Sequence, residues 1–136
     1  MEAQKEMTQE LFIPIRLDGL NEYIAAMNSS RYVGNKMKKY NTDIVHNTAR
    51  FSRLGHFTEP ITLNITYWEP NARRDPDNIL SAKKFILDGL KNAGVITNDG
   101  QKWIKGISEK WRVCGPEDHV GVHVVMTEVG NGREIN

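Results

Sequence analysis

The sequence has little of what marks disulfide-rich or membrane proteins. Cys114 is the only cysteine among 136 residues, so the chain can form no internal disulfide and no cysteine-rich metal site. We interpret Cys114 as a small buried apolar residue. No apolar run approaches the roughly 20 residues that a membrane-spanning helix needs, and the first residues lack the basic and apolar segments of a signal peptide. These absences predict a cytoplasmic protein with no membrane partner.

A strong overall charge is absent as well, because the formal net charge is only +1. The charges are unevenly distributed, however. Residues 31–56 carry six basic residues against Asp43 alone, whereas residues 1–30 and 115–136 are acidic. A polyanion responds to the local field, so this basic middle is compatible with nucleic-acid binding. A solvated helix face would explain the same bases equally well.

Length and composition fit one globular domain over residues 1–136. The chain alternates strand and helix patterns, which predicts an α+β fold with a mixed sheet packed against helices. The polar segments 1–9 and 128–136 are expected to be flexible tails. The expected elements, in order, are a strand at 11–17, helices at 22–28 and 34–53, a strand at 61–68, a helix at 77–93, and strands at 104–113 and 119–126.

Two segments carry specific predictions about burial. In helix 34–53, apolar residues recur at helical spacing and predict one buried stripe. In strand 104–113, alternation predicts an inward face on which Trp111 belongs to the core. The stripe comprises Met37, Tyr40, Ile44, Thr48 and Phe51, and the inward face comprises Ile107, Trp111 and Val113.

Local signals also predict where elements begin and end. Pro14 indicates that the first strand is an edge strand or ends there. Asn21 is a suitable N-cap for helix 22–28. Asp75 can cap helix 77–93 with Pro76 at its first position, and Gly94 is a suitable stop.

Carboxylates gather around the run Arg73-Arg74-Asp75-Pro76-Asp77-Asn78, and Asp99 follows about two dozen residues later. Two carboxylates separated by one residue at a helix entrance suit a hard divalent cation. Helix capping would explain Asp75 and Asp77 equally well, and Asn98-Asp99-Gly100 is by itself a turn signal. An EF-hand loop is excluded, because Leu80 and Ile86 occupy the positions that require glycine and glutamate.

This acidic run and the segments after it resemble the RusA family of Holliday junction resolvases. The resemblance covers roughly residues 11–127, and residues 17–24 resemble the N-terminal segment of phage and prophage members. It implies a Mg²⁺-dependent endonuclease, with Mn²⁺ as a substitute and no small-molecule cofactor. It further implies a two-fold homodimer that cuts four-way DNA junctions by symmetric nicks in a bacterial or phage-infected cell. The matching segments beyond the run are Lys83-Lys84-Phe85-Ile86-Leu87-Asp88-Gly89-Leu90, Ala93-Gly94-Val95 and Asn98-Asp99-Gly100-Gln101.

The resemblance also implies roles for individual residues. Asp75, Asp77 and Asp99 match the family's metal-binding acids. Counting back from Asp88 matches the essential lysine to Lys84, with Lys83 as the alternative, because this segment is about three residues longer than in the best-known members. Asn98 stands where those members have the first acid of a pair. Expected DNA contacts are Arg73, Arg74, Lys36, Lys39, Arg50 and Asn21.

Asp88 is too far along the helix, about 16 Å from Asp77, to share a metal ion with it. We expect Asp88 to be a structural partner of a base such as Lys84 one turn earlier.

Three functional hypotheses follow. The first is the endonuclease. The second is a protein that binds branched DNA without cutting it, which the Asn98 departure favours. The third is a metal-dependent phosphodiesterase acting on RNA or a small nucleotide. Turnover separates the first two, and a steep loss of affinity with salt would mark a protein that contacts many phosphates.

Overall fold

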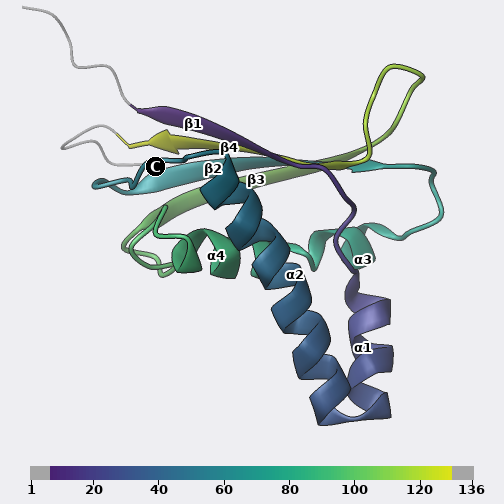
Figure 1. The fold of residues 1–136 in the computed structure, drawn as a ribbon. Coiled ribbons are helices and arrows are strands. Elements are labelled where there is room, and N and C mark those ends of the chain that lie inside the picture. The colour runs from purple at the N-terminus through teal and green to yellow at the C-terminus, as the bar shows by residue number, and fades with distance from the viewer. Residues whose placement is uncertain (1–6, 130–136) are drawn as a thin grey trace, which may run out of the picture.

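A computed structural model describes residues 7–129 as a single small α+β domain (Figure 1). The element order agrees with the sequence prediction, except that two consecutive helices replace the third one. The elements are β1 (Thr8–Ile13), α1 (Leu20–Ser29), α2 (Arg31–Phe51), β2 (Ile61–Glu69), α3 (Pro76–Leu80), α4 (Lys83–Asn92), β3 (Ile104–Val113) and β4 (Gly121–Glu128). Within the described residues, no helix is both long and apolar enough to cross a membrane.

The four strands form a mixed sheet in the order β1-β4-β2-β3. β4 pairs antiparallel with β1 and β2, whereas β2 and β3 are parallel. The helices all lie on one side of the sheet (Figure 1). β1 is an edge strand that ends immediately before Pro14, as predicted.

The predicted tails are shorter than expected where the structure describes them. Thr8 and Gln9 belong to β1, because they pair with Thr127 and Met126 of β4. Glu128 ends β4 and pairs with Ile61 of β2. The rest of the predicted tails, residues 1–6 and 130–136, lies outside the described residues.

The core lies between the sheet and α2 and α4. Alternate residues of β2 and β4 point into it, as predicted for these two strands. Apolar residues of α4 face them from the helical layer. The buried side chains include Ile61, Leu63, Ile65, Tyr67, Val122, Val124, Met126, Ile86 and Leu90.

The predicted stripe on α2 is only partly buried, since Ile44 packs against the core but Tyr40 and Phe51 do not. Tyr40 is 61% exposed and Phe51 is 90% exposed. The buried face is formed instead by Gly34, Asn41, Thr42, Val45 and Ala49. Small residues are buried because α2 lies close to α1 at Gly34, which packs against Met27, and close to α4 at Thr42 and Val45, which pack against Gly89.

The inward face predicted for strand 104–113 is wrong. Trp111 is 42% exposed, and Ile107 and Val113 are exposed as well. β3 is an edge strand, and the helices make few contacts with it. Cys114, just after β3, is partly exposed and is not the buried residue we expected.

The predicted helix 77–93 is divided into α3 and α4 at Ser81 and Ala82. Ser81 Oγ donates a hydrogen bond to the Asn78 carbonyl at 2.9 Å. The Ala82 N–H then bonds to the Ile79 carbonyl, so the regular helical ladder is interrupted. Asp75 and Pro76 occupy the predicted N-cap and first position of α3. Gly94, with φ of 77°, ends α4 as predicted.

Candidate active site

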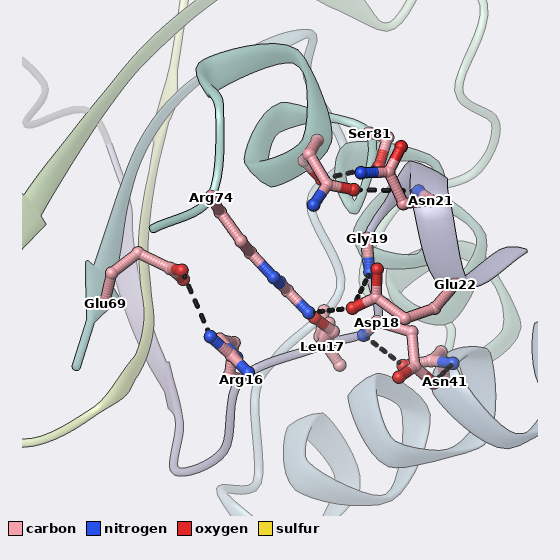
Figure 2. Close-up of polar contacts among 11 residues, drawn as sticks. Arg16, Leu17, Asp18, Gly19, Asn21, Glu22, Asn41, Glu69, Arg74 and Ser81 are labelled. Atoms are coloured by element: carbon pink, nitrogen blue, oxygen red, sulfur yellow. Dashed lines mark hydrogen bonds and ion pairs between the residues drawn. The ribbon is translucent and has the colours of Figure 1, made fainter. Parts of the chain in front are cut away.

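Two loops form the framework of the candidate site. The first connects β1 to α1, and the second connects β2 to α3. Arg74 of the second loop donates hydrogen bonds to the Leu17 carbonyl and to the Glu22 carboxylate (Figure 2). Its side chain is only 11% exposed. Arg74 therefore ties the two loops together and is largely buried, and its expected contact with DNA stays a prediction.

The charge state of Glu22 reflects this pairing. Burial alone would raise the pKa of its carboxyl. Hydrogen bonds from backbone N–H groups, including that of Gly19, and the Arg74 guanidinium outweigh this effect, so the pKa lies below its ordinary value of 4.5. Glu22 and Arg74 thus form a charged pair at neutral pH.

A close backbone approach joins α1 to α3. A Cβ at Gly19 would lie 2.4 Å from Asn78 Oδ1, so only glycine fits there. Gly19, and not Asn21, is the N-cap of α1. The Asn21 N–H instead donates to Asn78 Oδ1 at 2.8 Å. The predicted capping role of Asn21 is therefore wrong, because Asn21 is the second residue of α1 and its N–H bonds to Asn78 of α3.

Buried polar groups fix the first loop from the other side. Asn41 of α2 is buried, accepts a hydrogen bond from the Asp18 N–H at 3.0 Å and donates one to Asp18 Oδ2 at 2.8 Å. Glu69, at the end of β2, is 4% exposed, and its Oε1 atom lies 3.5 Å from an Arg16 nitrogen. Sequence reasoning missed both residues, since neither belongs to a recognisable pattern.

The two motif acids are accessible at the entrance of α3. Asp75 is the N-cap residue, but its side chain makes no capping hydrogen bond. Asp77 Oδ1 accepts the N–H of the adjacent Asn78 at 3.0 Å. Both side chains are exposed. Helix capping therefore does not account for the Asp75 carboxylate.

Lys84 of α4 lies beside Asp99 in the turn that precedes β3. Lys84 Nζ lies 3.2 Å from Asp88 and 3.9 Å from Asp99. The expected partnership between Lys84 and Asp88 is confirmed. Asp99 sits in a turn in which Asn98 Oδ1 accepts the Gly100 N–H at 2.9 Å. The turn signal is thus real, and it also carries the third acid to Lys84.

Lys83 faces the sheet instead. Its Nζ lies 2.9 Å from Glu109 of β3, and Glu109 also accepts the Tyr67 hydroxyl at 2.7 Å. Burial, followed by this contact with Glu109, raises the pKa of Tyr67. Lys83 therefore belongs to an internal polar cluster, whereas Lys84 stays accessible.

The structure does not gather the three predicted acids into one group. Within residues 7–129, no three His, Cys, Asp or Glu side chains are close enough to hold a metal ion together. Asp75 lines a cavity of about 330 Å³ with Arg73, Arg74 and Asn21. Lys84 lines a different cavity, described next.

A cationic groove lies between α2 and α4, and we call it the α2–α4 groove. Its volume is about 600 Å³. Of the predicted DNA contacts, Lys39 lines the groove and pairs with Asp43 at 2.6 Å, whereas Lys36 and Arg50 are exposed elsewhere on α2. The charged residues of the groove are Lys38, Lys39, Lys84, Lys91, Asp43 and Asp88.

Comparison with known proteins identifies no family. No protein-family profile matches the chain, and no curated protein matches it. One weakly similar solved structure is the crystal structure of hydrogenase maturation protein HypE, with 14% sequence identity and a TM-score of 0.34. The similarity covers 97% of this chain but only 34% of HypE, so the chain spans about a third of that protein.

Proposed function

We propose that this chain is a Mg²⁺-dependent, structure-selective DNA endonuclease of the RusA type, which resolves four-way junctions by paired nicks in recombination and repair. The observation that carries the proposal is the position of Lys84. Its ammonium group lies between Asp88 and Asp99, yet 61% of its side chain is exposed at the wall of the α2–α4 groove. A positioned and accessible cation in a basic groove suits a phosphodiester.

The donor set at the start of α3 fits Mg²⁺. This ion is commonly held by one or two carboxylates, with water and substrate phosphate as its other ligands. Asp75 and Asp77 would hold it, since both carboxylates are exposed and Asp75 makes no capping bond. When bound, Mg²⁺ supplies a polarised phosphoryl oxygen and an activated water. The family resemblance implies Asp99 as a further metal ligand, but in this structure Asp99 lies beside Lys84 and forms no group with the two other acids.

The protein's own residues have separate tasks in this proposal. Lys84 places positive charge beside the phosphate, and Asp88 and Asp99 hold the lysine in position. Arg74 holds the start of α3, where Asp75 and Asp77 lie, because it bonds to both Leu17 and Glu22. Other cations, including Lys39, would contact the DNA backbone without reading its sequence.

A homodimer completes the proposal. A four-way junction has approximate two-fold symmetry, so an isologous dimer would place equivalent sites on opposite strands. Two symmetric nicks then require one site in each protomer.

The test is cleavage of a synthetic four-way junction and of a linear duplex with the same sequence, in Mg²⁺ and in EDTA. We expect paired nicks on the junction only, in Mg²⁺ only. Asp77→Asn should reduce cleavage by at least about 100-fold, the cost of losing a charge-stabilising group at an active site. Glu117→Gln is the control, since Glu117 is an exposed acid in the β3–β4 loop and lines neither the cavity beside Asp75 nor the α2–α4 groove.

Other outcomes would reject the endonuclease. Tight junction binding without turnover in either Mg²⁺ or Mn²⁺ would support a non-catalytic branched-DNA-binding protein. If Asp77→Asn cleaves the junction as well as the wild type does, the start of α3 is not the active site.

A further inference from the structure

A second cavity adjoins the α2–α4 groove and differs from it in character. We call it the Tyr23 pocket. It has a volume of about 310 Å³ and a mostly apolar lining from the start of α1 and the break between α3 and α4. Its lining includes Leu20, Tyr23, Ser81 and Phe85.

The local structure explains why this pocket is open and apolar. The break at Ser81 separates α3 from α4, and Gly19 brings the start of α1 against Asn78. The Ser81 hydroxyl donates its proton to the Asn78 carbonyl. Tyr23 is half-buried, and its hydroxyl has no hydrogen-bond partner among the described residues. An aromatic ring is thus held at the wall without a fixed polar partner.

The pocket and the groove share two lysines, Lys38 and Lys84. Within residues 7–129, neither Lys38 nor Lys91 has a carboxylate within 4.0 Å, whereas Lys39 and Lys84 are paired. Four lysines therefore face the two acids of the groove, and positive charge remains in excess. The apolar pocket opens beside this excess charge.

We propose that the Tyr23 pocket receives the base of an unpaired nucleotide in a DNA strand. Lys38 and Lys84 hold the phosphate of that nucleotide at the pocket mouth, and the strand continues along the α2–α4 groove. A nucleotide is the ligand that combines a flat apolar ring with an adjacent anion, and base stacking on an aromatic side chain stabilises such complexes. The inference deepens the proposed function and rests on it for the identity of the strand.

Binding can be tested without cleavage. The trinucleotide TpTpT, the same trinucleotide with an abasic centre, and free thymidine 5′-monophosphate are each titrated into ¹⁵N-labelled protein in EDTA. We expect TpTpT to bind at least about fivefold more tightly than its abasic form, the usual effect of one stacked base. The backbone amide signals of Leu20, Tyr23 and Ser81 should shift with TpTpT but not with the abasic strand.

Matched variants separate base from phosphate binding. Tyr23→Leu should abolish the preference for TpTpT over the abasic strand, whereas Tyr32→Leu on the exposed face of α2 should keep it. Lys38→Gln should weaken both strands by about threefold or more, and Lys36→Gln, which lines neither cavity, should weaken them less. Thermal melting tests whether each variant is folded. The amide chemical-shift changes of the wild-type protein locate the base without the use of any variant.

The outcomes are distinct. Equal binding of the intact and abasic strands, or a preference that survives Tyr23→Leu, would overturn the base pocket. Thymidine monophosphate binding as tightly as TpTpT would replace the strand with a free nucleotide. If the base preference follows Tyr23 but no junction is cut, the pocket stands while the endonuclease proposal fails.

Discussion

At the scale of single residues, the Arg74–Glu22 pair makes the position of the start of α3, which carries Asp75 and Asp77, sensitive to pH. Because the pKa of Glu22 in the folded chain lies below its ordinary value of 4.5, the charged carboxylate stabilises the fold above that pH. This contribution is lost as pH falls through the folded pKa. The Arg74–Glu22 pair therefore holds the start of α3, with Asp75 and Asp77, most firmly in neutral solution.

Glu22→Gln should lower the free energy of unfolding at pH 7, and its difference from the wild type should shrink steadily below pH 4.5. Urea unfolding at a series of pH values measures both effects. Glu117→Gln in the β3–β4 loop is the control and should show neither effect. A difference that stays constant from pH 7 to pH 3 would contradict the role of the Glu22 charge.

Lys83 and Lys84 are adjacent residues, but we expect opposite phenotypes. Lys84→Ala should reduce junction cleavage by about 100-fold and change stability little, because 61% of the Lys84 side chain is exposed to solvent. Lys83→Ala should leave cleavage within about threefold and lower stability by about 1 kcal/mol, because it loses its contact with the partly buried Glu109. Single-turnover cleavage and urea unfolding of both variants decide this assignment, and the reverse pattern would make Lys83 the catalytic lysine.

At the scale of elements, the close contact of α2 with α4 depends on a glycine. A Cβ at Gly89 would lie 2.5 Å from Val45 Cβ and 3.0 Å from the Thr42 carbonyl oxygen. Gly89→Ala should therefore destabilise the protein by about 1–3 kcal/mol, although alanine favours helices more than glycine does. Thermal unfolding measures the loss, and Val45→Ala in the same chain should recover part of it. A stabilised single variant would show that the helices can separate without cost.

This contact also explains why the periodicity of apolar residues predicted the buried face of α2 only in part. Tyr40 and Phe51 were chosen because large apolar residues recur at helical spacing. A close helix–helix contact instead needs small residues such as Ala49, and the periodicity of large apolar residues does not identify them. Asn41 is buried because Asp18 and the Met37 carbonyl satisfy its amide. By contrast, β2 and β4 were predictable, because alternation directly reports a sheet with one covered face.

The candidate site was predictable only where residue type is tied to chemistry. Asp75, Asp77 and Lys84 could be selected because carboxylates and a lysine in this spacing match a known pattern. The roles of Arg74 and Glu69 could not be predicted, since each depends on a partner distant in sequence, Glu22 and Arg16 respectively. Such partnerships appear only when the two loops are brought together by the fold.

At the scale of the whole molecule, the proposed function requires two copies of the chain. We expect a mass in solution of about 31 kDa, twice the 15.5 kDa of one chain. Sedimentation equilibrium in the range of micromolar protein, with and without junction DNA, measures it. A monomer under both conditions would be incompatible with coordinated paired nicks. Asp77→Asn should have the same mass as the wild type, which separates assembly from catalysis.

The strand order has a consequence for synthesis on the ribosome. β4 lies between β1 and β2, although it follows both in the chain. β1 therefore has no neighbour in the sheet until the ribosome has released residues 121–128, more than one hundred residues later. Until then, β1 can pack against α2 but has no strand partner, while the parallel β2–β3 pair and the helices form their contacts. Completion of the sheet must therefore follow translation of β4, whereas the contacts that tie the first loop to Asn41 and Arg74 involve only residues made much earlier.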